Sequence, residues 1–304
     1  MNPFLRRFGA WAFTILLVHA VAFLLVRGAP GGPLDSAREL SPQVRAALES
    51  HYHLDAPLAE QYARALGGLL QGDLGPSMHY RGTGVSEVLA AGLPVSLALG
   101  AGGILVALLF GIVAGLGAAR RPGGVMDWAV RSGASLVMGI PNFILAGLGV
   151  AFFSFVLGWL PSAGSGGPAH FILPSLALGL PFAGQLSRLV RTRGLEVLAG
   201  DAVRAAKARG LSEFHILRFH VLPRTLVPVA AFLGPAAAGM LTGSLVVEQV
   251  FTLPGIGTHF VQAALNRDYT LALGATVLYT ALLGAATWAS DIWMARLDPR
   301  LGSR

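Results

Sequence analysis

The chain of 304 residues contains 54% hydrophobic and only 12% charged residues, and its mean hydropathy is +0.64. Average soluble proteins carry about twice that share of charge, so the composition excludes an ordinary soluble globular protein. The formal net charge of +7 raises the alternative of nucleic-acid binding, but the basic residues are sorted in a pattern typical of membrane topology. The lack of cysteine excludes disulfides and thiolate metal sites.

Residues 8–26 form an uncharged run that is long enough to cross a bilayer. A signal peptide is the alternative, but its hydrophobic core is about 7–15 residues long, and Arg27 stands where small cleavage-site residues are expected. We therefore predict that residues 1–27 comprise a short N-terminal segment and a first spanning helix. His19 is interpreted as a packed residue rather than a proton carrier, because no charged partner lies in the same run.

Residues 28–92 are more polar and predict a small folded extension outside the bilayer. Ser41 and Asp55 each precede a proline closely, which is typical of the start of a helix, so two short helices are expected here. His51 and His53 raise the question of a metal site. Two histidines two positions apart on a helix point in different directions, so we interpret them as surface residues.

Five further runs lack charged residues, and each is long enough to span a bilayer. Together with the first run they predict six spans and an all-α, polytopic membrane protein. The pairs Gly111/Gly115 and Gly239/Gly243 are spaced to allow close helix contacts. The five runs cover residues 93–119, 132–159, 169–187, 225–247 and 269–290.

The 22 basic residues divide sixteen to six between the two sides that these spans define. Since basic residues remain preferentially in the cytoplasm, both termini are predicted to be cytoplasmic. The minority side holds Arg27, Arg38, Arg45, Arg64, Arg81 and Arg267. The majority side holds Arg6, Arg7, Arg120, Arg121, Arg131, Arg188, Arg191, Arg193, Arg204, Lys207, Arg209, Arg218, Arg224, Arg296, Arg300 and Arg304.

Residues 200–223, GDAVRAAKARGLSEFHILRFHVLP, are the only long basic interval between two membrane-length runs. Asp201 is expected to cap a short helix, and Gly210 is expected to end it in the left-handed conformation. Ala205 and Ala206 would give this helix a flat face with a basic rim, a shape suited to another protein's groove. An ordinary positive cytoplasmic loop is the alternative.

A second helix is predicted to begin at Ser212 and to end before Pro223. Phe214, Leu217 and Val221 lie along it at helical spacing.

Familiar catalytic patterns are absent from the sequence. Lys207 is the only lysine and Ala208 follows it, so the chain has no G-x-x-x-x-G-K-[ST] loop for ATP phosphates. It also has no H-E-x-x-H or G-x-S-x-G pattern. The charge-free runs offer no evident proton or sodium relay. We expect a subunit that is not an enzyme, binds no metal or cofactor itself, and is driven by other proteins.

The basic interval resembles the coupling loop of ABC-importer membrane subunits, whose pattern is E-A-A, three residues, G, nine residues, I-x-L-P. The spacing matches at every step, with arginine in place of the acidic residue and histidine in place of isoleucine. Both departures are usual in the branch that imports peptides and nickel, whereas alanine at the middle position is less usual there than threonine. The matching residues are Arg204-Ala205-Ala206, Gly210, His220 and Leu222-Pro223.

Other segments extend this resemblance over nearly the whole chain. Residues 41–77, 243–257, 266–273 and 297–300 resemble parts of peptide-type permeases. Four short motifs, YHLDAP, GDLGPS, GPAAAGMLTGS and ALNRDY, resemble most the B-type membrane subunit of oligopeptide importers.

The resemblance implies a MetI-like permease that translocates oligopeptides across the bacterial inner membrane. Dipeptides, nickel or opines are alternative substrates; an intramembrane enzyme is the alternative of another class. Implied partners are a second homologous permease, two ABC ATPase subunits that hold ATP and Mg²⁺, an extracytoplasmic peptide-binding protein and membrane lipid. The implied division is 1–27, 28–92 and 93–304, with the coupling loop at 188–224. The residues implied to dock an ATPase subunit are Asp201, Arg204, Ala205, Ala206, Lys207, Gly210, Leu222 and Pro223.

Overall fold

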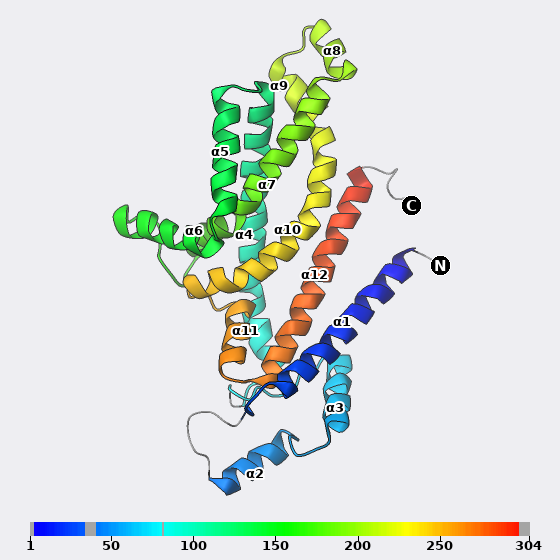
Figure 1. The fold of residues 1–304 in the computed structure, drawn as a ribbon, viewed down its shortest axis with the longest axis vertical. Coiled ribbons are helices and arrows are strands. Elements are labelled where there is room, and N and C mark those ends of the chain that lie inside the picture. Colours follow the sequence, from blue (N-terminus) through cyan, green and yellow to red (C-terminus); the bar gives the residue numbers. More distant parts are fainter. Residues whose placement is uncertain (1–2, 34–40, 81, 298–304) are drawn as a thin grey trace. The chain divides into compact units, whose positions relative to one another are not determined.

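A computed structural model describes residues 3–33, 41–80 and 82–297 (Figure 1). These residues are predominantly helical and contain no β-strand beyond one isolated bridge between Pro76 and Gly84. The α-helices are α1 (Pro3–Gly28), α2 (Pro42–His51), α3 (Leu58–Gln71), α4 (Val85–Arg120), α5 (Val125–Gly139), α6 (Asn142–Gly149), α7 (Ile172–Leu198), α8 (Asp201–Ala208), α9 (Glu213–Ile216), α10 (Leu222–Val250), α11 (Ile256–Leu265) and α12 (Tyr269–Leu297). A 3₁₀ turn, η2 (Pro168–Phe171), and two π-helical segments, η1 (Val150–Val156) and η3 (Leu217–Val221), complete them.

Five stretches of the described chain are long and apolar enough to cross a membrane. A sixth is reached only if α5 and the segment Asn142–Val156, which meet at an angle of 104°, count as one broken span. The sequence predicted an uninterrupted crossing over 132–159. The helix breaks at Ile140, which is extended (φ −96°, ψ 124°), because Pro141 lacks an N–H and disfavours helical backbone in the residue before it.

The predicted span 225–247 is part of a longer helical stretch. Segments α9, η3 and α10 follow one another without a gap from Glu213 to Val250. Glu248 therefore lies inside α10, where it is fully buried and accepts a hydrogen bond from the Ser96 hydroxyl at 2.8 Å. Glu248 lies one residue beyond the predicted span 225–247, so its charge marks neither the end of the helix nor an exposed position.

The chain divides by packing into two compact units. The first comprises Met1–Pro94 and Pro254–Gly284, and the second comprises Val95–Leu253 and Ala285–Arg304. These bounds follow side-chain contacts. The predicted division at residues 27 and 92 follows the sides of a membrane instead, and it stays a prediction.

In the first unit, α1 packs beside α3. His19 is 2% exposed and its ring lies 5.5 Å from that of Tyr62, in agreement with its interpretation as a packed residue. His51 and His53 are exposed.

The two short helices of the extension begin differently. Ser41 caps α2 as predicted, because its hydroxyl accepts the N–H of Val44 at 3.4 Å. The cap predicted at Asp55 is wrong. Helix α3 begins at Leu58, Pro57 occupies the cap position, and no side chain caps it.

Asp268, at the start of α12, joins two segments of the first unit. Its carboxylate is fully buried and accepts hydrogen bonds from the Ser77 hydroxyl, from the His79 N–H at 3.1 Å and from the Leu271 N–H at 3.0 Å. Ser77 ends the GDLGPS motif and Asp268 lies in the ALNRDY motif. Two motifs singled out by the resemblance thus meet around one buried carboxylate.

In the second unit, α4 and α7 approach closely where side chains are missing. A Cβ atom on Gly115 would lie 2.6 Å from the carbonyl oxygen of Ser187 and 2.7 Å from the Cβ atom of Val190. A Cβ atom on Gly179 would lie 2.5 Å from the carbonyl oxygen of Gly103. The predicted close contact at Gly115 is therefore found within the chain itself.

Candidate functional site

The basic interval after α7 folds as a short helix, α8, that begins differently from the prediction. Gly200, in an extended conformation (φ −76°, ψ 159°), occupies the cap position, and no side chain caps the helix. Asp201 is the first helical residue, and its carboxylate pairs with Arg204 one turn later. An acidic residue in the first turn still stabilises the helix through the dipole of the backbone. The cap predicted at Asp201 was therefore wrong in position.

The end of α8 follows the prediction. Gly210 has φ +76°, the left-handed region in which a Cβ atom is strained. Its N–H donates to the carbonyl of Lys207 at 2.9 Å, and the next N–H, that of Leu211, donates to the carbonyl of Ala206 at 3.2 Å. Gly210 thus turns the chain sharply and satisfies carbonyls at the end of the helix.

One face of α8 is anchored to its own chain. Val203 and Ala206 are fully buried and pack with Val197, Ile216 and Val221 in one apolar cluster. The expectation that both alanines face a partner is therefore wrong for Ala206. Positions three apart lie on the same face of a helix, so Ala206 lies on the buried face together with Val203. Ala205, one position earlier, is exposed.

The second helix begins as predicted and continues further than predicted. The Ser212 hydroxyl caps α9 by accepting the N–H of His215 at 3.3 Å. The helix does not end before Pro223. Leu222 and Pro223 instead form the first turn of α10, which continues η3 directly. Phe214, which shares helical spacing with Leu217 and Val221, is 73% exposed.

An ion pair ties α9 to the end of α4. The guanidinium of Arg120 donates two hydrogen bonds, at 2.8 and 2.7 Å, to the two carboxylate oxygens of Glu213. Both side chains are about half exposed, so water screens the pair and it adds little to stability. Its two-pronged geometry links the first residue of α9 to the last residue of α4.

A small, basic and aromatic surface remains exposed around α8. We call it the α8 surface, and it combines alanine methyl groups with exposed charged side chains and one aromatic ring. Such a patch suits a contact with another protein. It consists of Asp201, Arg204, Ala205, Lys207, Ala208 and Phe214.

The fold and this surface define a class, an all-α membrane protein of several spans that presents a short helix beside them. Residues 107–303 match the family described as "Binding-protein-dependent transport system inner membrane component". The chain is 40% identical over 297 residues to the dipeptide transport system permease protein DppB of Bacillus subtilis, covering 98% of this chain and 96% of that one. It is 39% identical over 290 residues to the oligopeptide transport system permease protein OppB of Escherichia coli, covering 95% of each.

Solved structures agree with the fold. The chain superposes on one from inward-facing crystals of the MetNI methionine ABC transporter with a TM-score of 0.55 and 20% identity, covering 69% of this chain and 96% of the other. A chain of an amino acid ABC transporter gives a TM-score of 0.52 at 17% identity, with coverages of 69% and 94%. The protein belongs to the family of binding-protein-dependent transport system inner membrane components, and it is a permease subunit of the ABC-importer class.

Proposed function

We propose that the chain translocates peptides across the bacterial inner membrane as one membrane subunit of an ATP-driven importer. Relatives of nearly equal identity carry the names dipeptide and oligopeptide permease, which supports a peptide substrate more strongly than any particular length. Oligopeptides remain our first choice because of the four motifs that resemble the oligopeptide branch. Dipeptides are the second candidate, favoured by the 40% identity to DppB.

The α8 surface is proposed as the docking site for an ATPase subunit. Its support is the arrangement of α8 itself: Val203 and Ala206 anchor one face, and Gly200 and Gly210 bound the helix, so the opposite face is held out from the spans. Movement of a docked partner would reach α10 through α9 and η3, which continue directly into it. ATP and Mg²⁺ would be bound by the partner, and the chain itself would need no cofactor.

The proposed assembly contains a second homologous permease, two ATPase subunits and an extracytoplasmic binding protein that delivers the peptide. The family description names a binding-protein-dependent system, which supports a binding protein in general terms. The sixteen-to-six division of basic residues supports cytoplasmic termini and a cytoplasmic α8 surface.

Two single substitutions test the docking site. Ala205→Glu places a charge and extra volume on the exposed face of α8, and Phe214→Ala removes the exposed ring on the adjoining helix α9. Both variants should fold, yet co-purify with less ATPase subunit and lose substrate-stimulated ATP hydrolysis in reconstituted vesicles. In the Ala205→Glu variant the reason is that an unpaired charge at an interface is costly. In the Phe214→Ala variant it is the loss of an aromatic contact. Ala47→Glu, at an exposed alanine of the short helix α2, is the matched control for ATPase retention.

Normal ATPase retention, hydrolysis and transport in both variants would show that α8 does not dock as proposed. Ala206→Glu answers a different question. Since Ala206 is fully buried in its own chain, this change should unfold the α8 region rather than merely weaken docking.

Topology is tested by single introduced cysteines, because the natural sequence has none. Ser50 and Ala208 are both exposed and suit the experiment, whereas Ser77 does not because it is 1% exposed. An impermeant thiol reagent applied to intact cells should label the Ser50→Cys variant and leave the Ala208→Cys variant unlabelled. Labelling of both variants would reject the proposed topology.

The substrate is tested in a strain that lacks other peptide importers. Deletion of the gene should abolish uptake of tri- and tetrapeptides and leave amino-acid uptake unchanged. Loss of dipeptide uptake alone would move the assignment to the second candidate, and unchanged uptake of all peptides would reject both.

A further inference from the structure

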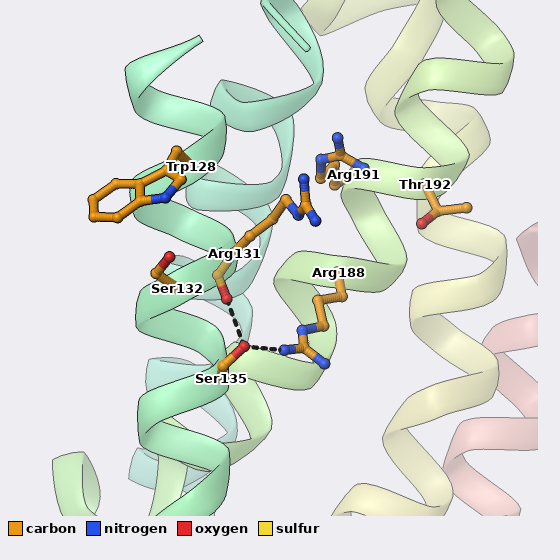
Figure 2. A pocket seen from close by; sticks show the side chains of 7 residues that line it. All are labelled: Trp128, Arg131, Ser132, Ser135, Arg188, Arg191 and Thr192. Atoms are coloured by element: carbon orange, nitrogen blue, oxygen red, sulfur yellow. Dashed lines mark hydrogen bonds between the residues drawn. The ribbon is translucent and has the colours of Figure 1, made fainter. Parts of the chain in front are cut away.

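A cavity of about 520 Å³ opens between α5 and α7 in the second unit (Figure 2). The two helices run antiparallel and pack against each other. Three arginines line it: Arg131 on α5, and Arg188 and Arg191 on α7. None of them belongs to the α8 surface, so the cavity is a separate feature of the protein.

One of the three arginines is already neutralised. Arg191 makes hydrogen bonds through Nε and Nη2 to the two carboxylate oxygens of Asp127, the latter at 2.8 Å. Asp127 is 1% exposed and also accepts the N–H of Gly123 at 2.8 Å. The pair holds the ends of α5 and α7 together, and its carboxylate has no free access to the cavity.

The other two arginines retain their charge toward the cavity. Arg188 donates to the hydroxyl of Ser135, which itself donates to the backbone carbonyl of Arg131 at 2.9 Å, as Figure 2 shows. Among the described residues, no carboxylate lies within ion-pair distance of Arg131 or Arg188. The hollow is thus lined by three guanidinium groups, and Asp127, which is paired with Arg191 and also interacts electrostatically with Arg131, offsets only part of their charge.

Their position in the sequence places these arginines at a membrane boundary. Arg131 directly precedes the charge-free run 132–159, and Arg188 directly follows the charge-free run 169–187. The boundary between charged and uncharged residues corresponds to the level of lipid headgroups. Trp128 lies at the same level, 70% exposed, as expected for the aromatic belt at a membrane surface.

The surface toward the membrane interior is apolar. Leu136 and Met138 follow Ser132 and Ser135 on neighbouring turns of α5, and they are 64% and 38% exposed. Figure 2 shows Trp128, Ser132 and Ser135 in succession along α5, with Ser135 turned toward Arg188 of α7 and the Trp128 ring turned away from α7. A molecule that fits this surface carries an anion at one end and hydrocarbon at the other.

We propose that this cavity binds the headgroup of an anionic phospholipid such as phosphatidylglycerol. The phosphate would lie between the guanidinium groups of Arg131 and Arg188, which suit two-pronged binding of phosphate oxygens. Its acyl chains would lie along Leu136 and Met138. A headgroup with an ammonium group would need a carboxylate to bind it. Among the described residues, the carboxylate found at the cavity is that of Asp127, which is buried and already paired with Arg191, so such a headgroup is disfavoured. Basic pockets between spanning helices are suited to such lipids.

The experiment measures lipid retained by the full-length chain, purified with whatever subunits accompany it. Samples are exchanged into detergent containing phosphatidylglycerol, phosphatidylethanolamine or glycerol phosphate, and bound lipid is counted by native mass spectrometry. The wild type should retain phosphatidylglycerol over phosphatidylethanolamine. Arg131→Gln with Arg188→Gln should weaken that binding about thirtyfold, since each basic residue at a membrane surface contributes about a factor of five.

Two further variants make the result specific. Arg193→Gln is the matched control, because Arg193 lies on the same helix, pairs with exposed Glu196 and does not line the cavity. It should retain the lipid. Ser132→Phe fills the cavity without touching an arginine, so it should also lose the lipid and covers the case in which the double variant fails to fold.

Four outcomes would overturn the proposal. The first is equal retention of phosphatidylethanolamine and phosphatidylglycerol by the wild type. The second is unchanged retention of phosphatidylglycerol in both the Ser132→Phe and the double variant. The third is equally strong binding of glycerol phosphate, which would mean a site for soluble phosphate compounds. The fourth is exclusion of lipid only when a partner subunit is present, which would assign the surface to a protein contact.

Discussion

The two units of the protein hold their helices in opposite ways. In the second unit, α4 and α7 meet where side chains are missing, and a Cβ atom on Gly115 would lie 2.6 Å from the backbone of the other helix. In the first unit, separate segments meet around a charged side chain, that of Asp268, which is fully buried. The contact at Gly115 leaves no room for a Cβ atom, whereas the contact at Asp268 depends on the carboxylate oxygens that accept its hydrogen bonds.

This difference follows from the surroundings of each contact. Between spanning helices, lipid is as apolar as a leucine side chain, so close packing distinguishes associated helices from separated ones. Where loops meet the end of a helix, backbone N–H groups lack intrahelical partners and need acceptors. Asp268 supplies such an acceptor at the start of α12 and to the segment after Ser77 at the same time.

The largest effect is expected from removal of the carboxylate. Asp268→Ala leaves the Ser77 hydroxyl and two backbone N–H groups without their acceptor in a fully buried place. The free energy of unfolding in detergent should fall by about 3 kcal/mol or more. Asp55→Ala, at an exposed aspartate, is the control and should change it by less than about 0.5 kcal/mol. Equal thermal stabilities of the two variants would remove Asp268 from its central role.

A smaller loss is expected from an added methyl group. Gly115→Ala forces a Cβ atom against Ser187 and Val190, and such overpacking costs about 1–3 kcal/mol. Gly100→Ala in the same helix meets nothing within 4 Å, so it should stabilise the protein by about 0.5–1 kcal/mol. Thermal unfolding of the two alanine variants separates the cost of a steric clash between helices from the gain in helix propensity. A stable Gly115→Ala protein would mean that α4 and α7 do not pack as closely as described.

The smallest effect is expected where a glycine is required for conformation rather than for contact. Gly210 meets nothing within 4 Å, but its φ is +76°. Gly210→Ala should therefore cost about 1 kcal/mol through backbone strain alone. Gly133→Ala, at an ordinary helical position with equally open space, should cost nothing. Proteolysis rates near α8 would report the difference, and identical rates would contradict the strain argument.

The sequence predicted much of this architecture because charge and hydropathy determine spans. Runs without charge marked the spanning helices, and Gly210 and Ser212 marked a helix end and a helix start that the structure confirms. The break at Pro141 was not predicted, because prolines are tolerated inside membrane helices and only tertiary contacts decide which of them bend the chain. Pro181, for example, lies within the uninterrupted α7.

The candidate site was predicted less well than the fold. The spacing of Ala205 and Ala206 indicated a small-residue face, but it did not reveal which of the two packs inward, because Val203 and Ile216 decide that only in three dimensions. The helical spacing of Phe214 with Leu217 and Val221 did not reveal that its ring is exposed. The Arg131 and Arg188 cavity was also missed. Its signal was present, however, since each arginine adjoins one end of a charge-free run.

The stiffness of the continuous helical stretch from Glu213 to Val250 varies along its length. At about 1.5 Å per residue it is a rod of about 57 Å. Pro223, Pro228 and Pro235 lie inside it, and each lacks one N–H of the ladder of hydrogen bonds that resists bending. A force applied at α9 would therefore be converted into bending at these prolines. The prolines in this helical stretch, which have no backbone N–H, therefore determine where the protein bends under load.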